Sequence, residues 1–209
     1  MDKKTDNHNI NAKLELRRYF LRKYHADQPP SVFDCCQGSG KLWGILRNEY
    51  QVASYWGVDV KPKKGRLKVD SIRMLQAGVR ADVVDIDTYG YPWKHWNAIN
   101  SDLRSPVTVF LTFGLTNIGS SVEKCAAEAI GVSGLKLPST IWSNIANMSA
   151  SYCLTRHCEF STIIEAVESL SDGNARYFGI RVEPKQNEPI ASTIGSEHQQ
   201  AIKEPAHVR

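Results

Sequence analysis

The sequence contains no apolar run long enough to cross a membrane. Its first residues, from Met1 to Asp6, form a polar stretch that does not resemble a signal peptide. The chain holds only five cysteines, an odd number, and Cys35 and Cys36 are adjacent. That pattern argues against a disulfide framework. We therefore expect a cytoplasmic protein that does not enter a membrane.

Candidate metal ligands are equally scarce. Cys153, His157 and Cys158 form a short cluster, but no second pair stands at a spacing that would complete a zinc site. No internal repeat is evident. The net charge of +4 permits a nucleic-acid partner without requiring one. We expect no metal centre.

The 209 residues suit a single domain with a real core. Residues 1–11 are polar and are expected to form a loose N-terminus. Residues 12–184 carry the pattern of one folded domain, without a separate substrate-recognition domain. Residues 185–209 are polar and are expected to form a disordered tail.

One stretch, residues 32–40, organises the rest of the chain. A short apolar run that ends at Asp34 leads into two glycines, Gly38 and Gly40, and apolar residues at helical spacing follow. This pattern predicts a strand, a tight turn and the start of a helix. Glycines in such a turn let the backbone approach a ligand closely. In α/β proteins a nucleotide-like ligand usually lies there.

Several motifs share this layout. A phosphate-binding P-loop is excluded, because Leu42 stands where that motif needs Ser or Thr and Cys35 where it needs its first glycine. The dinucleotide fingerprint matches at Gly38 and Gly40 but has Trp43 at its third small position. A plain strand–turn–helix connection without a ligand is a further alternative.

The run Asp34-x-x-x-Gly38-Ser39-Gly40 fits another motif better. It resembles the first motif of class I S-adenosylmethionine-dependent methyltransferases, which reads D-x-G-x-G-x-G. The sequence departs from that motif at Cys36, which stands where the family has its first glycine. The resemblance implies that this turn, with Cys36 in it, binds S-adenosylmethionine.

Acidic residues end the next two predicted strands. Asp59 lies near the end of residues 55–60, where a carboxylate accepts hydrogen bonds from ribose hydroxyls. Asp70 ends the short strand predicted for residues 67–71, where methyltransferases place an acidic residue against the adenine amino group. An alternative role for Asp70 is the N-cap of a helix over residues 71–77.

Two further aspartates lie in residues 81–92, which read as a fourth strand broken by glycine and proline. Asp85 and Asp87 alternate, so their side chains share one face of the strand. Paired carboxylates on a central strand are costly unless they are partnered or solvated. A ligand crevice would supply that setting, so we count Asp85 among the candidate cofactor-binding residues.

The segment from Asp85 to Gly90 also resembles a family motif. It is similar to the D-x-D-P-[FY]-G motif of tRNA guanine-N2 dimethyltransferases, with Thr88 in place of proline, and more loosely to the [DN]-P-P-[YF] motif of amino-directed methyltransferases. The resemblance implies that Asp87 accepts hydrogen bonds from the target amine and that Tyr89 stacks on the base. It extends over about residues 34–114.

A helix is predicted for residues 12–25, with an apolar stripe and many cations. The cations form either a solvated basic face or a surface that contacts phosphates beside the site. They are Lys13, Arg17, Arg18, Arg22 and Lys23.

The rest of the chain carries fewer signals. Helices are predicted for residues 93–100, 122–130 and 141–152. An amphipathic helix capped by Ser161 is predicted for residues 161–170. A buried fifth strand is predicted for residues 107–114, and an antiparallel last strand for residues 175–182.

Together these patterns predict an α/β, Rossmann-like, doubly wound and mostly parallel sheet of seven strands, or a truncated form, with an antiparallel edge strand. The expected function is transfer of a methyl group from S-adenosylmethionine to an amino group, with a nucleic-acid base as acceptor and RNA favoured over DNA. One alternative is a non-catalytic ligand-binding protein on a degenerate methyltransferase fold. Another is an NADP-linked oxidoreductase, with the basic residues 61–66 on the 2′-phosphate.

Overall fold

The computed structural model describes residues 9–61, 67–88, 91–114, 127–128, 144, 148–149, 151–155, 161–169 and 175–185. Its helices are α1 (Ile10–Tyr24), α2 (Lys41–Glu49), α3 (Ser71–Gln76) and α4 (Trp93–Asn100). Its strands are β1 (Ser31–Asp34), β2 (Ser54–Asp59), β3 (Leu67–Lys68), β4 (Val83–Ile86), β5 (Val107–Gly114), β6 (Ser161–Ser169) and β7 (Ala175–Pro184).

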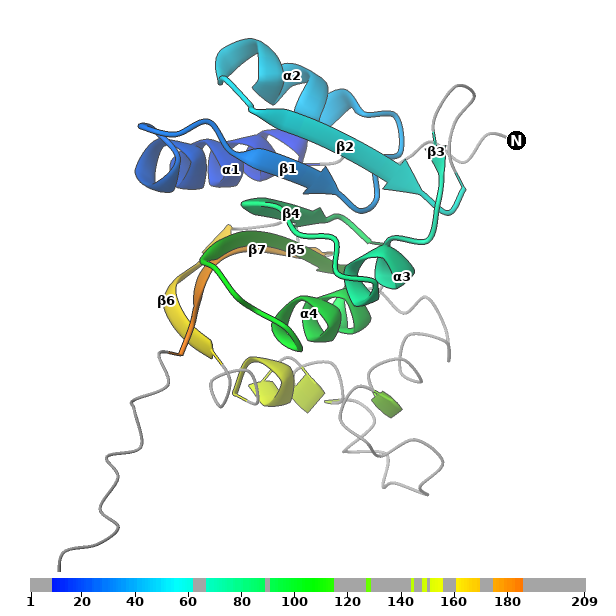
Figure 1. Cartoon of the computed structure of the whole chain (residues 1–209). Helices are drawn as coiled ribbons and strands as arrows, with labels where there is room; N and C mark the ends of the chain where they lie inside the picture. The colour runs from blue at the N-terminus through cyan, green and yellow to red at the C-terminus, as the bar shows by residue number, and fades with distance from the viewer. Residues whose placement is uncertain are drawn as a thin grey trace, which may run out of the picture.

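The strands described by the structure form one seven-stranded sheet in the order β3-β2-β1-β4-β5-β7-β6 (Figure 1). The first five strands along the chain pair in parallel, whereas β7 is antiparallel to both β5 and β6. The predicted fold class is therefore confirmed. Because the winding reverses between β1 and β4, this point is where open α/β sheets bind ligands, at the carboxyl ends of the strands.

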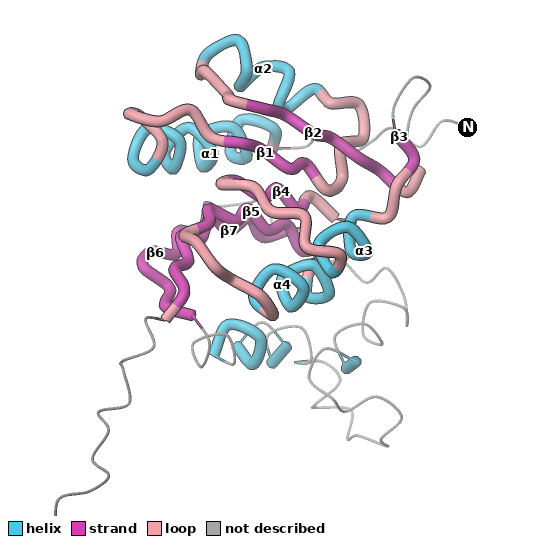
Figure 2. Tube along the Cα trace, viewed as in Figure 1, coloured by secondary structure: helices cyan, strands magenta, loops and turns pink. Residues whose placement is uncertain are grey.

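Helices cover both faces of the sheet (Figures 1 and 2). Phe20 of α1 and Trp43 of α2 share one apolar cluster with Val32 of β1. Phe33, the next residue of β1, belongs to the opposite cluster, which contains Trp96 of α4 and residues of α3. This division follows from the two-residue period of a strand, which sends neighbouring side chains to opposite faces.

The helix predicted for residues 161–170 is wrong, because this segment is strand β6. Its side chains alternate between inward and exposed positions, and it pairs with β7. Ser161 does not cap a helix; its hydroxyl donates to the side-chain oxygen of Asn100 at 3.2 Å. Glu165 lies on the side of β6 that faces α1 and accepts hydrogen bonds from the hydroxyl groups of Tyr19 and Tyr24 of that helix.

Other predictions lie wholly or partly outside the described residues. Of the predicted helices 122–130 and 141–152, only residues 127–128, 144, 148–149 and 151–152 are described, and these are helical. Residues 62–66 and residues 186–209, which make up most of the predicted disordered segment, are not described. Within the part of the chain that is described, no helix has the length and apolarity that crossing a membrane requires.

Replacement of two glycines by alanine is expected to have opposite effects. A Cβ at Gly179 of β7 would overlap the ring of Phe20, which is fully buried, so Gly179→Ala should destabilise the fold by about 1–3 kcal/mol. Gly44 lies in α2, and a Cβ added there would meet no atom within 4 Å, so Gly44→Ala should stabilise the fold by up to about 1 kcal/mol. Urea unfolding measures the free energy of unfolding of both variants. Equal changes in stability would contradict the packing of α1 against β7.

Candidate functional site

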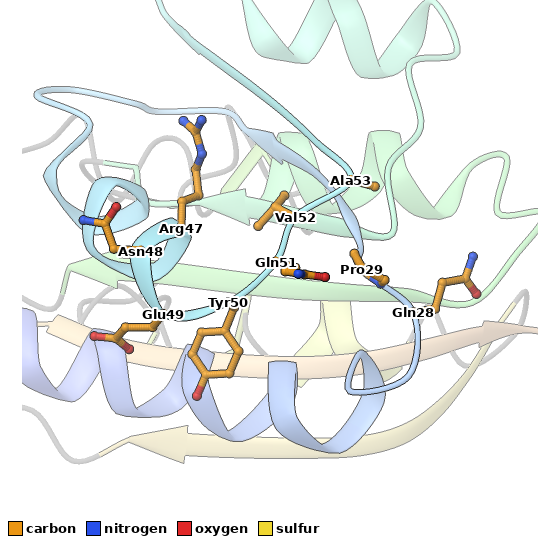
Figure 3. A pocket seen from close by; sticks show the side chains of 9 residues that line it. All are labelled: Gln28, Pro29, Arg47, Asn48, Glu49, Tyr50, Gln51, Val52 and Ala53. Atoms are coloured by element: carbon orange, nitrogen blue, oxygen red, sulfur yellow. The ribbon is translucent and has the colours of Figure 1, made fainter.

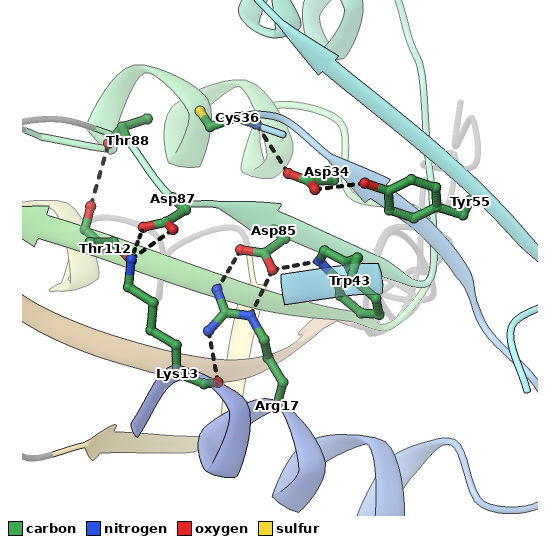
Figure 4. Close-up of polar contacts among 10 residues, drawn as sticks. All are labelled: Lys13, Arg17, Asp34, Cys36, Trp43, Tyr55, Asp85, Asp87, Thr88 and Thr112. Atoms are coloured by element: carbon green, nitrogen blue, oxygen red, sulfur yellow. Dashed lines mark hydrogen bonds and ion pairs between the residues drawn. The ribbon is translucent and has the colours of Figure 1, made fainter. Parts of the chain in front are cut away.

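Four aspartates gather at the carboxyl edge of the sheet. Asp34 is the last residue of β1 and Asp59 the last residue of β2. Asp85 lies in β4, and Asp87 is the first residue after that strand. The three strands are adjacent in the sheet. Cys36 lies among them: burial, together with the charges of all four aspartates, raises the pKa of its thiol. The structure thus brings the predicted site residues of β1, β2 and β4 to one edge of the sheet. Figure 4 shows four of them, Asp34, Cys36, Asp85 and Asp87.

The turn after β1 depends on its glycines. Gly38 and Gly40 adopt φ values of 52° and 69°, in the left-handed region that glycine enters without a steric cost. The backbone N–H of Gly38 donates to Oδ2 of Asp59 at 3.0 Å, and the N–H of Lys61 donates to Oδ1 at 2.8 Å. Asp59 therefore ties the glycine turn to the end of β2, and each of its oxygens keeps a second lone pair.

Asp70 is the N-cap of α3. Its Oδ1 accepts hydrogen bonds from the backbone N–H groups of Ile72 and Arg73, at 2.9 and 3.4 Å. The capping role that the sequence offered as an alternative is therefore confirmed. The side chain remains 45% exposed, so contact with adenine stays a prediction.

Asp85 faces the protein interior. Its Oδ1 accepts from Arg17 Nη2 at 2.6 Å, and its Oδ2 accepts from Arg17 Nε and from Trp43 Nε1, each at 2.7 Å (Figure 4). The Arg17 and Asp85 side chains are only 1% and 2% exposed. In this arrangement Asp85 belongs to an internal ion pair and not to a ligand surface.

Asp87 pairs with a second cation from the same helix. Lys13 Nζ lies 2.7 Å from both of its carboxylate oxygens. Burial raises the pKa of Asp87, but the charges of Lys13 and Arg17 more than offset this, so its pKa lies below the ordinary value. Asp87 is therefore ionised at neutral pH. The predicted stacking residue, Tyr89, lies outside the described residues.

Two of the α1 cations, Lys13 and Arg17, match neither predicted role, whereas Arg22 and Lys23 are exposed, as a solvated basic face requires. Lys13 and Arg17 are buried against aspartates, and Arg18 pairs with Glu49 instead of facing solvent alone. Sequence reasoning missed the first two, although a signal was present: Lys13 and Arg17 stand at the helical spacing that continues the apolar stripe of Phe20 and Tyr24. Cations in such a stripe face the interior and need buried acids as partners.

Asp34 is the most perturbed carboxyl group of the site. It is buried beside Asp85, its partner across the β1–β4 pair, and it accepts hydrogen bonds from the Tyr55 hydroxyl at 2.8 Å and from the Cys36 N–H at 3.3 Å. Burial and the charge of Asp85 raise the pKa of Asp34 to about 8. Asp34 therefore holds a proton at neutral pH.

An open pocket of about 720 Å³ lies at the opposite edge of the sheet (Figure 3). Its walls are the chain segments that enter β1 and β2, so it sits at the amino ends of the strands and contains none of the predicted site residues. The residues that line the pocket are Gln28, Pro29, Arg47, Asn48, Glu49, Tyr50, Gln51, Val52 and Ala53.

Comparison with known proteins supports the fold. No protein-family model matches the sequence, and no curated protein matches it. The solved structure of Trm1 from Pyrococcus horikoshii with S-adenosyl-L-methionine matches with a TM-score of 0.56 and 13% identity, over 84% of this chain and 54% of that one. The candidate methyltransferase yhhF from Escherichia coli matches with a TM-score of 0.50 and 13% identity, over 84% and 86%.

This chain has the fold of these two proteins. It spans only about half of the Trm1 chain, 54%. At 13% identity the likeness establishes the architecture, and the activity has to be argued from the residues of the site.

Arg17→Met should destabilise the protein by about 3–5 kcal/mol, because it leaves the charge of Asp85 buried without a partner. The double variant Arg17→Met/Asp85→Asn should recover part of this loss, since a neutral amide oxygen still accepts from Trp43. Arg18→Met, which removes a surface pair, is the control and should have a much smaller effect. Urea unfolding measures the free energy of unfolding of the three variants. A similar loss of stability in Arg17→Met and Arg18→Met would refute the internal ion pair.

Asp34→Asn should change how stability depends on pH. The folded protein binds the Asp34 proton more tightly than the unfolded chain, since the pKa rises from 3.8 to about 8, so this group lowers stability progressively as pH rises between those values. Asparagine has no such proton, and the stability of the variant relative to wild type should increase from about pH 5 to about pH 8. A constant difference in unfolding free energy would rule out the raised pKa.

Proposed function

We propose that the protein is an S-adenosylmethionine-dependent methyltransferase that acts on an amino group, with a nucleic-acid base as acceptor and RNA favoured over DNA. One observation carries the proposal. The glycine turn held by Asp59 and the ionised carboxylate of Asp87 lie at the same edge of the sheet, on the two sides of the switch point between β1 and β4.

The residues on the β1–β2 side fit the adenosyl group. Asp59 keeps lone pairs for ribose hydroxyls, Asp70 keeps an exposed carboxylate for the adenine amino group, and Gly38 and Gly40 leave room for close approach. Cys36 replaces a family glycine with a small thiol, which its raised pKa keeps uncharged. When bound, S-adenosylmethionine supplies an electrophilic methyl group.

The residues on the β4 side fit the acceptor. Asp87 is ionised and partly exposed, so it can accept a hydrogen bond from an amine and take up the proton that the nitrogen loses. Tyr89 is proposed to stack on the acceptor ring. Most of the rate enhancement comes from aligning the amine with the methyl group. Asp85 is proposed to support this side through Arg17 rather than to touch the cofactor.

A nucleic-acid acceptor is supported by exposed cations at the same edge, because phosphates bind lysine and arginine. The cations lie at or near the starts of helices that follow strands and at the ends of β2 and β3. They are Lys41, Lys61 and Lys68, together with Arg73, which lies 3.6 Å from Asp70, and Lys94, which lies 3.3 Å from Glu128. The preference for RNA rests on the resemblance of the segment from Asp85 to Gly90 to tRNA methyltransferases.

Calorimetry should detect binding of both S-adenosylmethionine and S-adenosylhomocysteine, and Asp59→Asn should weaken it about 10-fold or more, because a charged acceptor of ribose hydrogen bonds is lost. Asp102→Asn, at the opposite edge of the sheet, is the matched control and should bind as wild type does. NADPH tests the oxidoreductase alternative. If neither sulfur compound binds, the proposal fails.

The transfer step is tested with a radiolabelled methyl donor and bulk tRNA, rRNA or DNA. Label should enter the nucleic acid, and Asp87→Asn should slow its entry by about 100-fold, the usual contribution of such a group. Transfer that does not depend on Asp87 would refute its assignment.

A non-catalytic ligand-binding protein on the same fold is the second candidate. It is favoured by the contact of Lys13 Nζ with both oxygens of Asp87 and by the departures from the family motifs at Cys36 and Thr88. It predicts cofactor binding without transfer of label to any nucleic acid.

A further inference from the structure

The contact between Lys13 and Asp87 leaves part of the carboxylate accessible. Because Nζ is 2.7 Å from both oxygens, the ammonium lies near the bisector of the carboxylate and uses about one lone pair of each oxygen. The Lys13 side chain is 10% exposed and the Asp87 side chain 30%. The accessible part of the pair is thus the carboxylate, and an amine can donate to an outer lone pair that Lys13 and the Thr112 side chain leave free.

Lys13 is held firmly in this position. Arg17 Nη1 donates to the Lys13 carbonyl oxygen at 3.0 Å, and Arg17 is itself locked to Asp85. The ammonium also lies 5.1 Å from the ring centre of Tyr177, which is buried. Release of Asp87 by Lys13 would break the contacts of the ammonium with both carboxylate oxygens and move it away from the Tyr177 ring, so we treat Lys13 as a fixed part of the acceptor site.

The charges on this side of the site balance. Lys13 and Arg17 offset Asp87 and Asp85, and Asp34 carries a proton because of its raised pKa. A neutral, half-buried site offers no attraction that would offset the loss of water around an incoming ammonium group. The fixed charge of Lys13 also repels an ammonium group at close range. An uncharged amino group meets neither penalty.

We propose that Lys13 determines the specificity of the acceptor site. By neutralising Asp87 it selects uncharged amino groups, such as the exocyclic amines of nucleobases, over alkylammonium groups, such as those of lysine side chains and polyamines. The inference rests on the proposed function, since it takes Asp87 as the residue that receives the acceptor.

The test measures binding of guanosine, adenosine, cytidine and spermidine by calorimetry at low salt, with S-adenosylhomocysteine present. Wild type should bind at least one nucleoside more tightly than spermidine. Lys13→Met should gain about 10-fold or more in spermidine affinity, because it uncovers the charge of Asp87. Lys13→Arg should keep the wild-type preference. Lys185→Met, which removes an exposed lysine at the other edge of the sheet, is the control.

The double variant Lys13→Met/Asp87→Asn separates charge from folding. It removes both charges, keeps the site neutral and should restore the preference for uncharged amines even if Lys13→Met alone folds poorly. Tighter binding of spermidine than of any nucleoside by wild type, or an unchanged preference in Lys13→Met, would overturn the proposal. The same binding measurements are repeated without S-adenosylhomocysteine. They separate the specificity role of Lys13 from the methyltransferase function, because a failure to bind the cofactor then counts against the proposed function alone.

Discussion

The geometry of the site depends on one electrostatic constraint. Parallel pairing of β1 with β4 sets Asp34 beside Asp85, and Asp87 lies two residues further on the same face. Three carboxylates so close together in a buried setting cannot all remain charged without partners. Arg17 and Lys13 of α1 supply two positive charges, and a bound proton neutralises Asp34.

This solution makes α1 part of the site and not only a cover for the sheet. Arg17 reaches the interior end of the aspartate row, and Lys13, one helical turn earlier, reaches its outer end. The same face of the helix places Phe20 in the core beneath. The packing of α1 and the charge of the acceptor side are thus two results of one helix orientation, and a shift of α1 would alter both.

The sequence by itself determined most of the architecture. The alternation of apolar residues and the glycine turn correctly placed β1, β2, β4, β5, α2 and α4, and β7 as the antiparallel last strand, because these signals are local. Strand ends also follow from local breaks, so the gathering of Asp34, Asp59 and Asp87 at one edge was predictable once a parallel sheet was inferred. The N-cap role of Asp70 was also predictable from the sequence, as one of two alternatives, because a cap is a local signal.

Tertiary structure decided which side chains are buried and which groups they contact. The spacing of Lys13 and Arg17 looks the same on a solvated face and on a buried one, because helical periodicity specifies a direction and not the group that lies there. Residues 161–169 became a strand because β7 offered them a partner, and Glu165 lies on the side of that strand that faces α1, which provides donors. Strand pairing and ion pairing join residues far apart in the chain, so no local pattern records them.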